Sequence, residues 1–482
     1  MRKPAAALLP LLAALLAGCA AVGPDYKPPA PPTVLDAAFI NAGASGVNSQ
    51  APSADIASFW RGFGDPALTA LVERSLAVNG DVRIAQARLQ EARATLQGAR
   101  AEQLPEIDAT ADVARALSPA YSFPGLSRSE RTATVYDAGF TASWELDFFG
   151  RTRRLSESAA ARVEASEAGL HAAHTAVAAE VARNYLGLRA LQRRYQVASD
   201  SIVNQRDSLQ LTSARLDVGR GTQLDVSRAS SQLASTEAVL PALQASIDQT
   251  AYRLATLTAQ SPRAVADALA APQPLPSLPV TDLGAMPLGT PEQLLRRRPD
   301  LIIAERQLAA ATSDIGVATA DLFPRISLSG LIGFSSTNLS QLTERDSQQY
   351  SLGAALTWPL LDFGRVRSRI SASEARAQQA LATYEQTVST ALEETEGALT
   401  QFTRSAQQSN RLADAARYAE EAQQLARVRF DAGAADFLTV LDAERQTLSA
   451  RDALVQSQLS QATALVSVYR ALGGGWNVSD AK

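Results

Sequence analysis

The spacing of hydrophobic residues changes twice along the chain, each time at a similar eight-residue turn. The turns are Trp144–Arg151 and Trp358–Arg365. Before each turn apolar residues alternate with polar ones, as in a strand, and after it they follow helical spacing over a long stretch. Each turn therefore predicts a junction between a strand and a helix, and its recurrence indicates a tandem duplication.

Other landmarks repeat in the same order. Leu104-Pro105 is matched by Phe323-Pro324 before the strands, and Leu216–Gly219 by Phe430–Gly433 far downstream. The repeating unit is about half the chain, which is too long for a solenoid repeat. One fold with two similar halves is predicted.

Four runs alternate between apolar and polar residues, and they predict two hairpins. Their apolar members are Ile107, Ala109, Ala111 and Val113; Ala138, Phe140, Ala142, Trp144, Leu146 and Phe148; Ile326, Leu328, Gly330, Ile332 and Phe334; and Leu352, Ala354, Leu356, Trp358 and Leu360. Each run is close to the roughly ten residues that a tilted strand needs to cross a bilayer. The tryptophans that end two of the runs suit either a membrane interface or packing beneath the strands.

Four strands are too few to close a membrane barrel. Strands span a bilayer only as a closed barrel, and single-chain barrels begin at about eight strands. The chain is therefore expected to oligomerise: two subunits would reach the minimum, and three would leave a lumen. The alternative, a soluble four-stranded sheet, would not explain the amino-terminal motif described below.

Long helices follow both turns. A helix is also expected from Asp65-Pro66 to about Gln103. Residues 151–218 and 365–430 contain no proline and almost no turn signal, so each would be roughly 100 Å long as one helix. Each ends at a glycine turn, from which a shorter helix returns, and Pro241 should kink the first returning helix.

The second long stretch has the spacing of a coiled-coil seam. The seam consists of Leu381, Tyr384, Val388, Ala391, Ala398, Phe402, Leu412, Ala416, Ala419, Ala426 and Phe430. Polar residues interrupt it at Thr395, Ser405, Ser409 and Gln423. Such interruptions suit a hollow assembly.

The amino terminus has the pattern of an exported lipoprotein. Arg2 and Lys3 precede an apolar run, residues 5–17, that is too short to span a membrane. The run ends in Leu-Ala-Gly-Cys, a match to the bacterial lipobox, and Cys19 is the only cysteine. Cleavage before Cys19 and its acylation are expected; a stray cysteine is the alternative. Ala20 follows the cysteine. The resemblance to sorted lipoproteins implies delivery to the outer membrane, since an aspartate at this position usually retains the protein at the inner membrane.

Composition narrows the function classes. The net charge of −4 argues against nucleic-acid binding, and a single cysteine excludes an internal disulfide and a metal site built from several thiolates. His171 and His174 would make half a metal site on a helix, but a surface pair is the better interpretation. Nucleophile elbow, phosphate loop and H-E-x-x-H patterns are missing from the sequence, so no catalytic residue, metal site or enzyme activity is predicted.

The predicted organisation follows from these patterns. It comprises a signal peptide (1–18), a lipid-anchored extended tether (19–58), a first-half helix (59–104), a first hairpin (105–150), a first long helical hairpin (151–260), an inter-repeat linker (261–300), a second-half helix (301–323), a second hairpin (324–364), a second long helical hairpin (365–470) and a tail (471–482).

Several motifs together resemble the TolC-like outer membrane factors, most closely their NodT- or OprM-like lipoprotein branch. Besides the lipobox, the turns and the helical tips, they are Gly23–Tyr26, Phe59-Trp60 with Asp65-Pro66, and Leu294–Asp300. The resemblance implies an α+β fold: a trimeric outer-membrane β-barrel, with four strands per subunit and twelve in all, continuous with a long periplasmic α-helical barrel, and an equatorial collar formed by the segments between the halves.

The same resemblance implies the exit duct of a tripartite pump for small molecules. The homotrimer would sit in outer-membrane lipid and work with a periplasmic membrane-fusion adaptor and an inner-membrane resistance-nodulation-division transporter, without a cofactor beyond the lipid on Cys19. A structural envelope lipoprotein without transport, a metal-ion efflux duct and a protein-secretion duct remain alternatives. The chain has only two methionines, which gives no support to a relay of soft metal ions.

Leu438, Asp442 and Arg445 share one helical face just after the second glycine turn. Three subunits would bring three Asp442 carboxylates toward the axis, and Arg445 would pair with neighbouring charges. Spacing alone favours a solvated helix face, but the resemblance favours a periplasmic gate. The repeat places Arg228 at the position of Asp442, so the gate is expected at the second tip only.

The two glycine turns are candidates for adaptor contact, because small residues leave the backbone accessible. These tip residues are Val218, Gly219 and Gly221 in the first half and Gly433 and Ala434 in the second. A plain connection between two helices is the alternative interpretation.

Overall fold

The computed structural model describes residues 21–30, 39–40, 56–279 and 290–474. The chain forms two compact units. Unit 1 takes residues up to Ala30, Arg88–Ser166 and Ile303–Tyr384, and unit 2 takes Pro31–Ala87, Glu167–Ile302 and Glu385 onward. The predicted signal peptide, Cys19, much of the tether and most of the tail lie outside the described residues.

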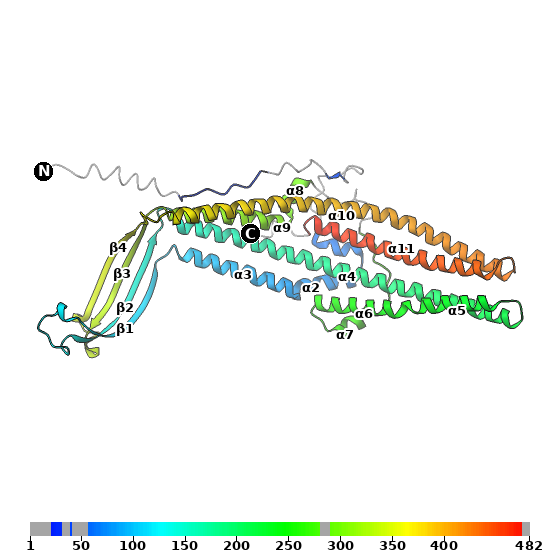
Figure 1. The fold of residues 1–482 in the computed structure, drawn as a ribbon, viewed down its shortest axis with the longest axis horizontal. Helices are drawn as coiled ribbons and strands as arrows, with labels where there is room; N and C mark the ends of the chain where they lie inside the picture. Colours follow the sequence, from blue (N-terminus) through cyan, green and yellow to red (C-terminus); the bar gives the residue numbers. More distant parts are fainter. Residues whose placement is uncertain (1–20, 31–38, 41–55, 280–289, 475–482) are drawn as a thin grey trace. The chain divides into compact units, whose positions relative to one another are not determined.

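Unit 1 contains a four-stranded antiparallel sheet (Figure 1). Its strands, β1 (Glu106–Leu117), β2 (Thr132–Leu146), β3 (Arg325–Ser336) and β4 (Gln348–Thr357), pair in sequence order. The two predicted hairpins are confirmed, and pairing of β2 with β3 joins them into one sheet. The predicted strands ran on to Phe148 and Leu360, which was wrong, because the backbone has already turned there.

The strand register collects most of the large apolar residues of the four strands on one face; Leu331, opposite Thr141 and Ser351, lies on the other. In one row Ala109 lies opposite Phe140, Phe140 opposite Ile332, and Ile332 opposite Tyr350. The last three are 57%, 66% and 86% exposed. Because side chains alternate along a strand, the neighbouring rows of polar and small residues lie on the other face.

The repeated turns begin the two long helices, α4 (Arg151–Asp217) and α10 (Arg365–Asp431), as predicted. Asp147 Oδ2 accepts hydrogen bonds from the Thr152 hydroxyl (2.8 Å) and the Arg153 N–H (3.0 Å). In the second copy Asp362 accepts from the N–H groups of Val366 and Gly364, which hold the pKa of Asp362 below its usual range. Each aspartate therefore satisfies backbone donors at a helix start that would otherwise lack a partner.

Both tryptophans at the turns hold the end of the preceding helical segment. Trp144 donates its indole N–H to the carbonyl of Gln103 (3.0 Å), and Trp358 donates to that of Leu322 (2.9 Å). These carbonyls follow α3 (Gly80–Ala101) and α9 (Pro299–Ala320). The indoles are partly exposed, at 37% and 48%.

Unit 2 contains helices of both halves. They are η2 (Ile56–Phe63), α2 (Pro66–Val78), α5 (Gln223–Glu237), α6 (Val239–Leu257), α7 (Pro262–Leu269), α8 (Pro291–Arg297) and α11 (Phe437–Ala471). None of the helices in the described part of the chain is long and apolar enough to cross a membrane.

Two predicted helices are broken, one near Pro241, where a kink was expected, and one where none was expected. The first returning helix divides at Ala238 into α5 and α6, because Pro241 lacks the N–H that would bond one turn back. The helix expected from residue 66 to about 103 divides at Asn79, whose amide donates to the Leu257 carbonyl (2.9 Å) while its oxygen caps Asp81 of α3 (2.8 Å). An uninterrupted helix there was wrong.

The core of unit 2 explains two of the sequence motifs. Phe59 stacks on Tyr469 at 4.7 Å between ring centroids, and Trp60 packs edge-on against the same ring. Asp65 caps α2 and also accepts a hydrogen bond from the hydroxyl of the buried Tyr185 (2.6 Å). Burial and this bond raise the pKa of Tyr185 to about 12.

The predicted seam of α10 is buried over most of its length. Buried members include Val388, Ala391, Ala398, Phe402, Ala416, Ala426 and Phe430, whereas Leu381 is 36% exposed. The polar interruptions Thr395 and Ser405 are buried as well, and each hydroxyl donates to a carbonyl of its own helix. Their hydrogen bonds are thus met within the helix, so these polar residues fit a packed seam.

The motif Leu294–Asp300 is a clasp around the buried Arg298. The guanidinium bonds the carboxylates of Asp300 and Glu394, each at 2.7 Å, and reaches the carbonyls of Ala391 and Ala471. One side chain therefore ties the start of α9 to α10 and to the end of α11.

Candidate functional site at the helical tips

The two tips of unit 2 share one backbone design. At the first, Gly219 has a φ of +70°, its N–H bonds Leu216 O, and Arg220 N–H bonds Arg215 O. At the second, Gly433 has a φ of +72°, and the same two bonds recur, from Gly433 to Phe430 and from Ala434 to Arg429. This pattern is the Schellman motif, in which glycine takes the left-handed position.

The returning helices also start alike, three residues after each glycine. The Thr222 hydroxyl accepts from Asp225 N–H (3.2 Å), and the Asp436 carboxylate accepts from Thr439 N–H (3.0 Å). The Thr439 hydroxyl and N–H, and to a smaller extent the charge of Arg228, hold the pKa of Asp436 below its usual range. Arg228 therefore acts on Asp436 at the second tip.

The two tips pack against each other within unit 2. The Arg215 guanidinium lies over the Phe430 ring, 3.9 Å from its centroid, and donates to the Phe430 carbonyl (3.0 Å). A small apolar cluster lies beneath, formed by Ala229, Ala426, Phe430, Phe437, Val440 and Leu441. The tips are therefore held as a pair, with Val218, Gly219, Gly433 and Ala434 exposed and Gly221 half-buried at their ends.

Leu438, Asp442 and Arg445 lie on the exposed face of α11. Leu438 is 48% exposed, and the Asp442 carboxylate accepts from the Gln446 side chain (2.7 Å). Within the described residues no ion pair of Asp442 or Arg445 is found at 4.0 Å or less. This face therefore carries both signs of charge, and neither has a partner of opposite charge in the described part of one chain.

The opposite face of the same turn carries a residue that the sequence analysis missed. Glu444 is only 4% exposed, and its Oε1 accepts from the Ser208 hydroxyl of α4 (2.7 Å). In the sequence it stands between an alanine and an arginine in a charged run, which suggests solvent exposure. Its position in the apolar stripe Phe437, Val440, Leu441 was the available signal.

Unit 1 holds a second feature that bears on function, a docked amino-terminal strap consisting of residues 21–26. The buried Arg154 bonds Asp25 (2.6 Å) and the carbonyl of Val22 (3.2 Å). A Cβ on Gly23 would lie 2.5 Å from Gly316 Cα, so only glycine fits there. Tyr26 donates to Glu305 (3.0 Å).

We expect Arg154→Ala to free the strap, because its carbonyl and carboxylate partners would lose their donor. Limited proteolysis should then cut the chain near residue 25 at least several-fold faster than in wild type. Arg162→Ala, which removes a half-exposed partner of Asp314 in the same unit, is the matched control and should leave this rate unchanged. Equal protection of both variants would contradict the assignment.

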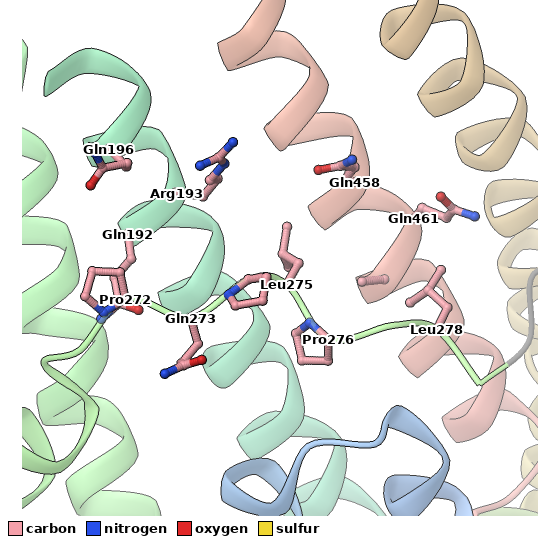
Figure 2. Close-up of a pocket in the computed structure, with 12 residues that line it drawn as sticks. Gln192, Arg193, Gln196, Pro272, Gln273, Leu275, Pro276, Leu278, Gln458 and Gln461 are labelled. Carbon is pink, nitrogen blue, oxygen red and sulfur yellow. The ribbon is translucent and has the colours of Figure 1, made fainter. Parts of the chain in front are cut away.

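A hollow of about 680 Å³ lies elsewhere in unit 2. Figure 2 shows the proline-rich segment 272–278 crossing between α4 and α11, with Gln196 and Arg193 on one wall and Gln458 and Gln461 on the other. Gln192 is already bonded to Leu269 and Arg189. The residues described as lining it are amides, prolines, small apolar groups and one arginine, which form no acid/base pair.

His171 and His174 lie 6.4 Å apart between ring centroids and line a smaller hollow of about 230 Å³. Both are half-buried, so the expected surface pair is partly covered. Burial and the neighbouring imidazole lower the pKa of His174. Among the described residues no group of three histidine, cysteine, aspartate or glutamate side chains is placed to hold a metal ion.

Comparison with known proteins matches both halves of the chain. The family described as "Outer membrane efflux protein" matches residues 71–260 and 290–474. Outer membrane protein OprJ of Pseudomonas aeruginosa is 34% identical, covering 99% of this chain and 97% of OprJ. The pyoverdine export outer membrane protein OpmQ of that organism is 35% identical over 88% of each chain. The solved structure of the outer-membrane channel OprN has a TM-score of 0.85 at 39% identity, covering 94% of this chain and 99% of OprN.

Proposed function

This chain belongs to the outer membrane efflux protein family and is an outer-membrane component of an efflux system, and we propose that it works as a passive, gated duct assembled from three copies. The family resemblance drawn from the sequence is confirmed. Export of small molecules is the proposed task, since the relatives are channels of this kind and one is named for pyoverdine export.

The four-stranded sheet supports this proposal most directly. Its apolar face has the exposed Phe140, Ile332 and Tyr350, which suits contact with lipid, and its other face is polar enough for water. Within the described residues β1 and β4 each pair along one edge only. In lipid the free edges need hydrogen-bond partners, and β4 of one copy paired with β1 of the next supplies them. Three copies then close a barrel with a lumen.

The proposed lipid on Cys19 fits this arrangement. The strap that begins at Ala21 is fastened to Arg154, which lies just after the turn that follows β2. Two residues of extended chain reach about 7 Å. The acyl chains would therefore enter the membrane beside the ends of the strands.

We place the gate at Leu438, Asp442 and Arg445 and the adaptor contact at the exposed glycine tips. Asp442 and Arg445 make no ion pair within the described residues of one chain, so we expect oppositely charged partners from neighbouring copies. Three like carboxylates near an axis repel each other unless a cation or an arginine offsets them. Pairing of Asp442 with an arginine of the next copy would hold the tips together.

The Asp442→Ala/Arg445→Ala variant tests the duct and its gate together. We expect purified wild-type protein in planar bilayers to give small, flickering currents, and the double variant to give currents larger by roughly tenfold, because the charges that close the tips are gone. Leu224→Ala, at the matching exposed position of the first tip, should behave as wild type.

Three results have distinct meanings. Pores that are unchanged by the double variant would keep the duct and move its gate elsewhere. Assembled trimers that never conduct would favour a structural envelope lipoprotein. A protein that stays monomeric under mild detergent extraction would contradict the barrel built from three copies.

A further inference from the structure

A buried polar cluster lies behind the proposed gate, at the contact of α4, α10 and α11 in unit 2. We name it the Glu444 cluster: Ser208, Arg427 and Glu444 are in contact, and we include the buried Gln205, which lies one turn before Ser208 on α4. Arg427 donates to the Ser208 hydroxyl (3.3 Å), and that hydroxyl donates to Glu444 (2.7 Å). The guanidinium itself stays 3.9 Å from the carboxylate, which is the limit of an ion pair.

The cluster leaves buried polar atoms without partners. Glu444 Oε2 and both amide atoms of Gln205 have no hydrogen bond among the described residues, and these side chains belong to residues that are 4% and 2% exposed. An unpaired buried polar group destabilises the folded state, and a charged one does so more strongly. An ionised Glu444 would have one bonded and one bare oxygen in this site, so the packed tip disfavours the ionised form.

Tandem duplication does not account for the cluster. The two long helices are of equal length, so positions in the two halves of the chain correspond at a constant offset. At the positions that match the cluster, the other half has Ala419 for Gln205, Ala422 for Ser208, Ser213 for Arg427 and Ser230 for Glu444. Each member of the cluster therefore has a different residue type at the matching position of the other half. The cluster is confined to the wall behind the second tip, where the gate residues lie.

We propose that a proton on Glu444 holds α11 against α4 and α10, and that loss of this proton loosens the second tip and widens the duct. The inference rests on the proposed function, since it needs a duct with its gate on α11. Glu444 is a positioning residue: it lies two residues after Asp442 and one before Arg445, on the buried side of the same turn. A shift of α11 driven by Glu444 therefore moves the gate face.

The charges around Glu444 fix the direction of the pH effect. Arg427 of α10 is the only charged side chain described as acting on it, while α4 presents Ser208 and α11 turns Asp442 and Arg445 away. Burial raises the pKa of Glu444 above the ordinary 4.5, and the Ser208 bond and Arg427 offset part of this. The packed tip binds the proton more tightly than a loosened tip, so packing is favoured at low pH and lost as pH rises through the raised pKa.

Single-channel conductance of assembled trimers, recorded from about pH 5 to about pH 8, tests the proposal, because exposed carboxyls titrate mostly below this range. Wild type should conduct several-fold more at the upper end. Glu444→Gln, which mimics the protonated carboxyl, should stay low and flat. Glu421→Gln, an exposed glutamate of α10, should keep the wild-type pH step.

Ser208→Ala supplies a second readout that a merely structural role would not move. It removes the donor to ionised Glu444, so the midpoint of the step should shift to higher pH. A flat wild-type profile, a step retained in Glu444→Gln, or an unshifted midpoint in Ser208→Ala would each overturn the inference. Trimers without any pore would instead overturn the duct itself.

Discussion

Arg298→Ala is expected to lower the unfolding free energy by about 3 kcal/mol, the lower end of what breaking a buried ion pair costs. The lower end applies because the partner carboxylates, Asp300 and Glu394, are about 40% exposed and regain water. The carbonyls of Ala391 and Ala471 also lose a donor. Thermal unfolding followed by circular dichroism in detergent should show a lower midpoint.

Arg296→Ala is the control for this loss. Arg296 belongs to the same run of three arginines but is exposed. Its removal should change the unfolding free energy by no more than about 0.5 kcal/mol. Equal effects of the two variants would show that the run acts through its total charge, and would contradict the clasp.

We expect that most molecules of the Gly139→Ala variant fail to form a stable sheet. Gly139 of β2 lies opposite Gly333 of β3, and a Cβ at Gly139 would lie 2.6 Å from the Ile332 carbonyl oxygen and 2.8 Å from Gly333 Cα. Those atoms are backbone and cannot rotate away, so the strands must separate. The yield of folded protein recovered from outer membranes should fall at least tenfold.

Gly330→Ala is the matched control, because it too replaces a glycine within a strand of the same sheet, here β3. Its added Cβ would meet nothing closer than 3.9 Å, which is ordinary contact. The yield of folded protein should therefore stay near the wild-type level. Normal yield from Gly139→Ala would mean that the strands tolerate a wider spacing than the close glycine pair implies.

The local preferences of glycine and proline predicted well where helices end. Glycine turns at Gly219 and Gly433 end the long helices because only that residue takes the left-handed conformation freely, and Pro241 breaks the returning helix. The pairing of β2 with β3 could not be predicted in this way. Nearly two hundred residues separate these strands, and no turn signal reports a contact over that distance.

The candidate site was predictable on its exposed side only. Helical spacing placed Leu438, Asp442 and Arg445 on one face, and the structure puts them there. Glu444 was missed because burial depends on what the neighbouring helices bring, and Ser208 and Arg427 come from two other elements. Cys19 lies outside the described residues, so its acylation stays a prediction.

The strap also sets an order of events during biogenesis. Its residues are synthesised early, yet Tyr26 bonds Glu305, which is 279 residues downstream, and Gly23 packs against Gly316. It cannot be fastened until well over half of the polypeptide has followed it. The strap therefore stays undocked while these residues are being made, and its docking reports that unit 1 has folded.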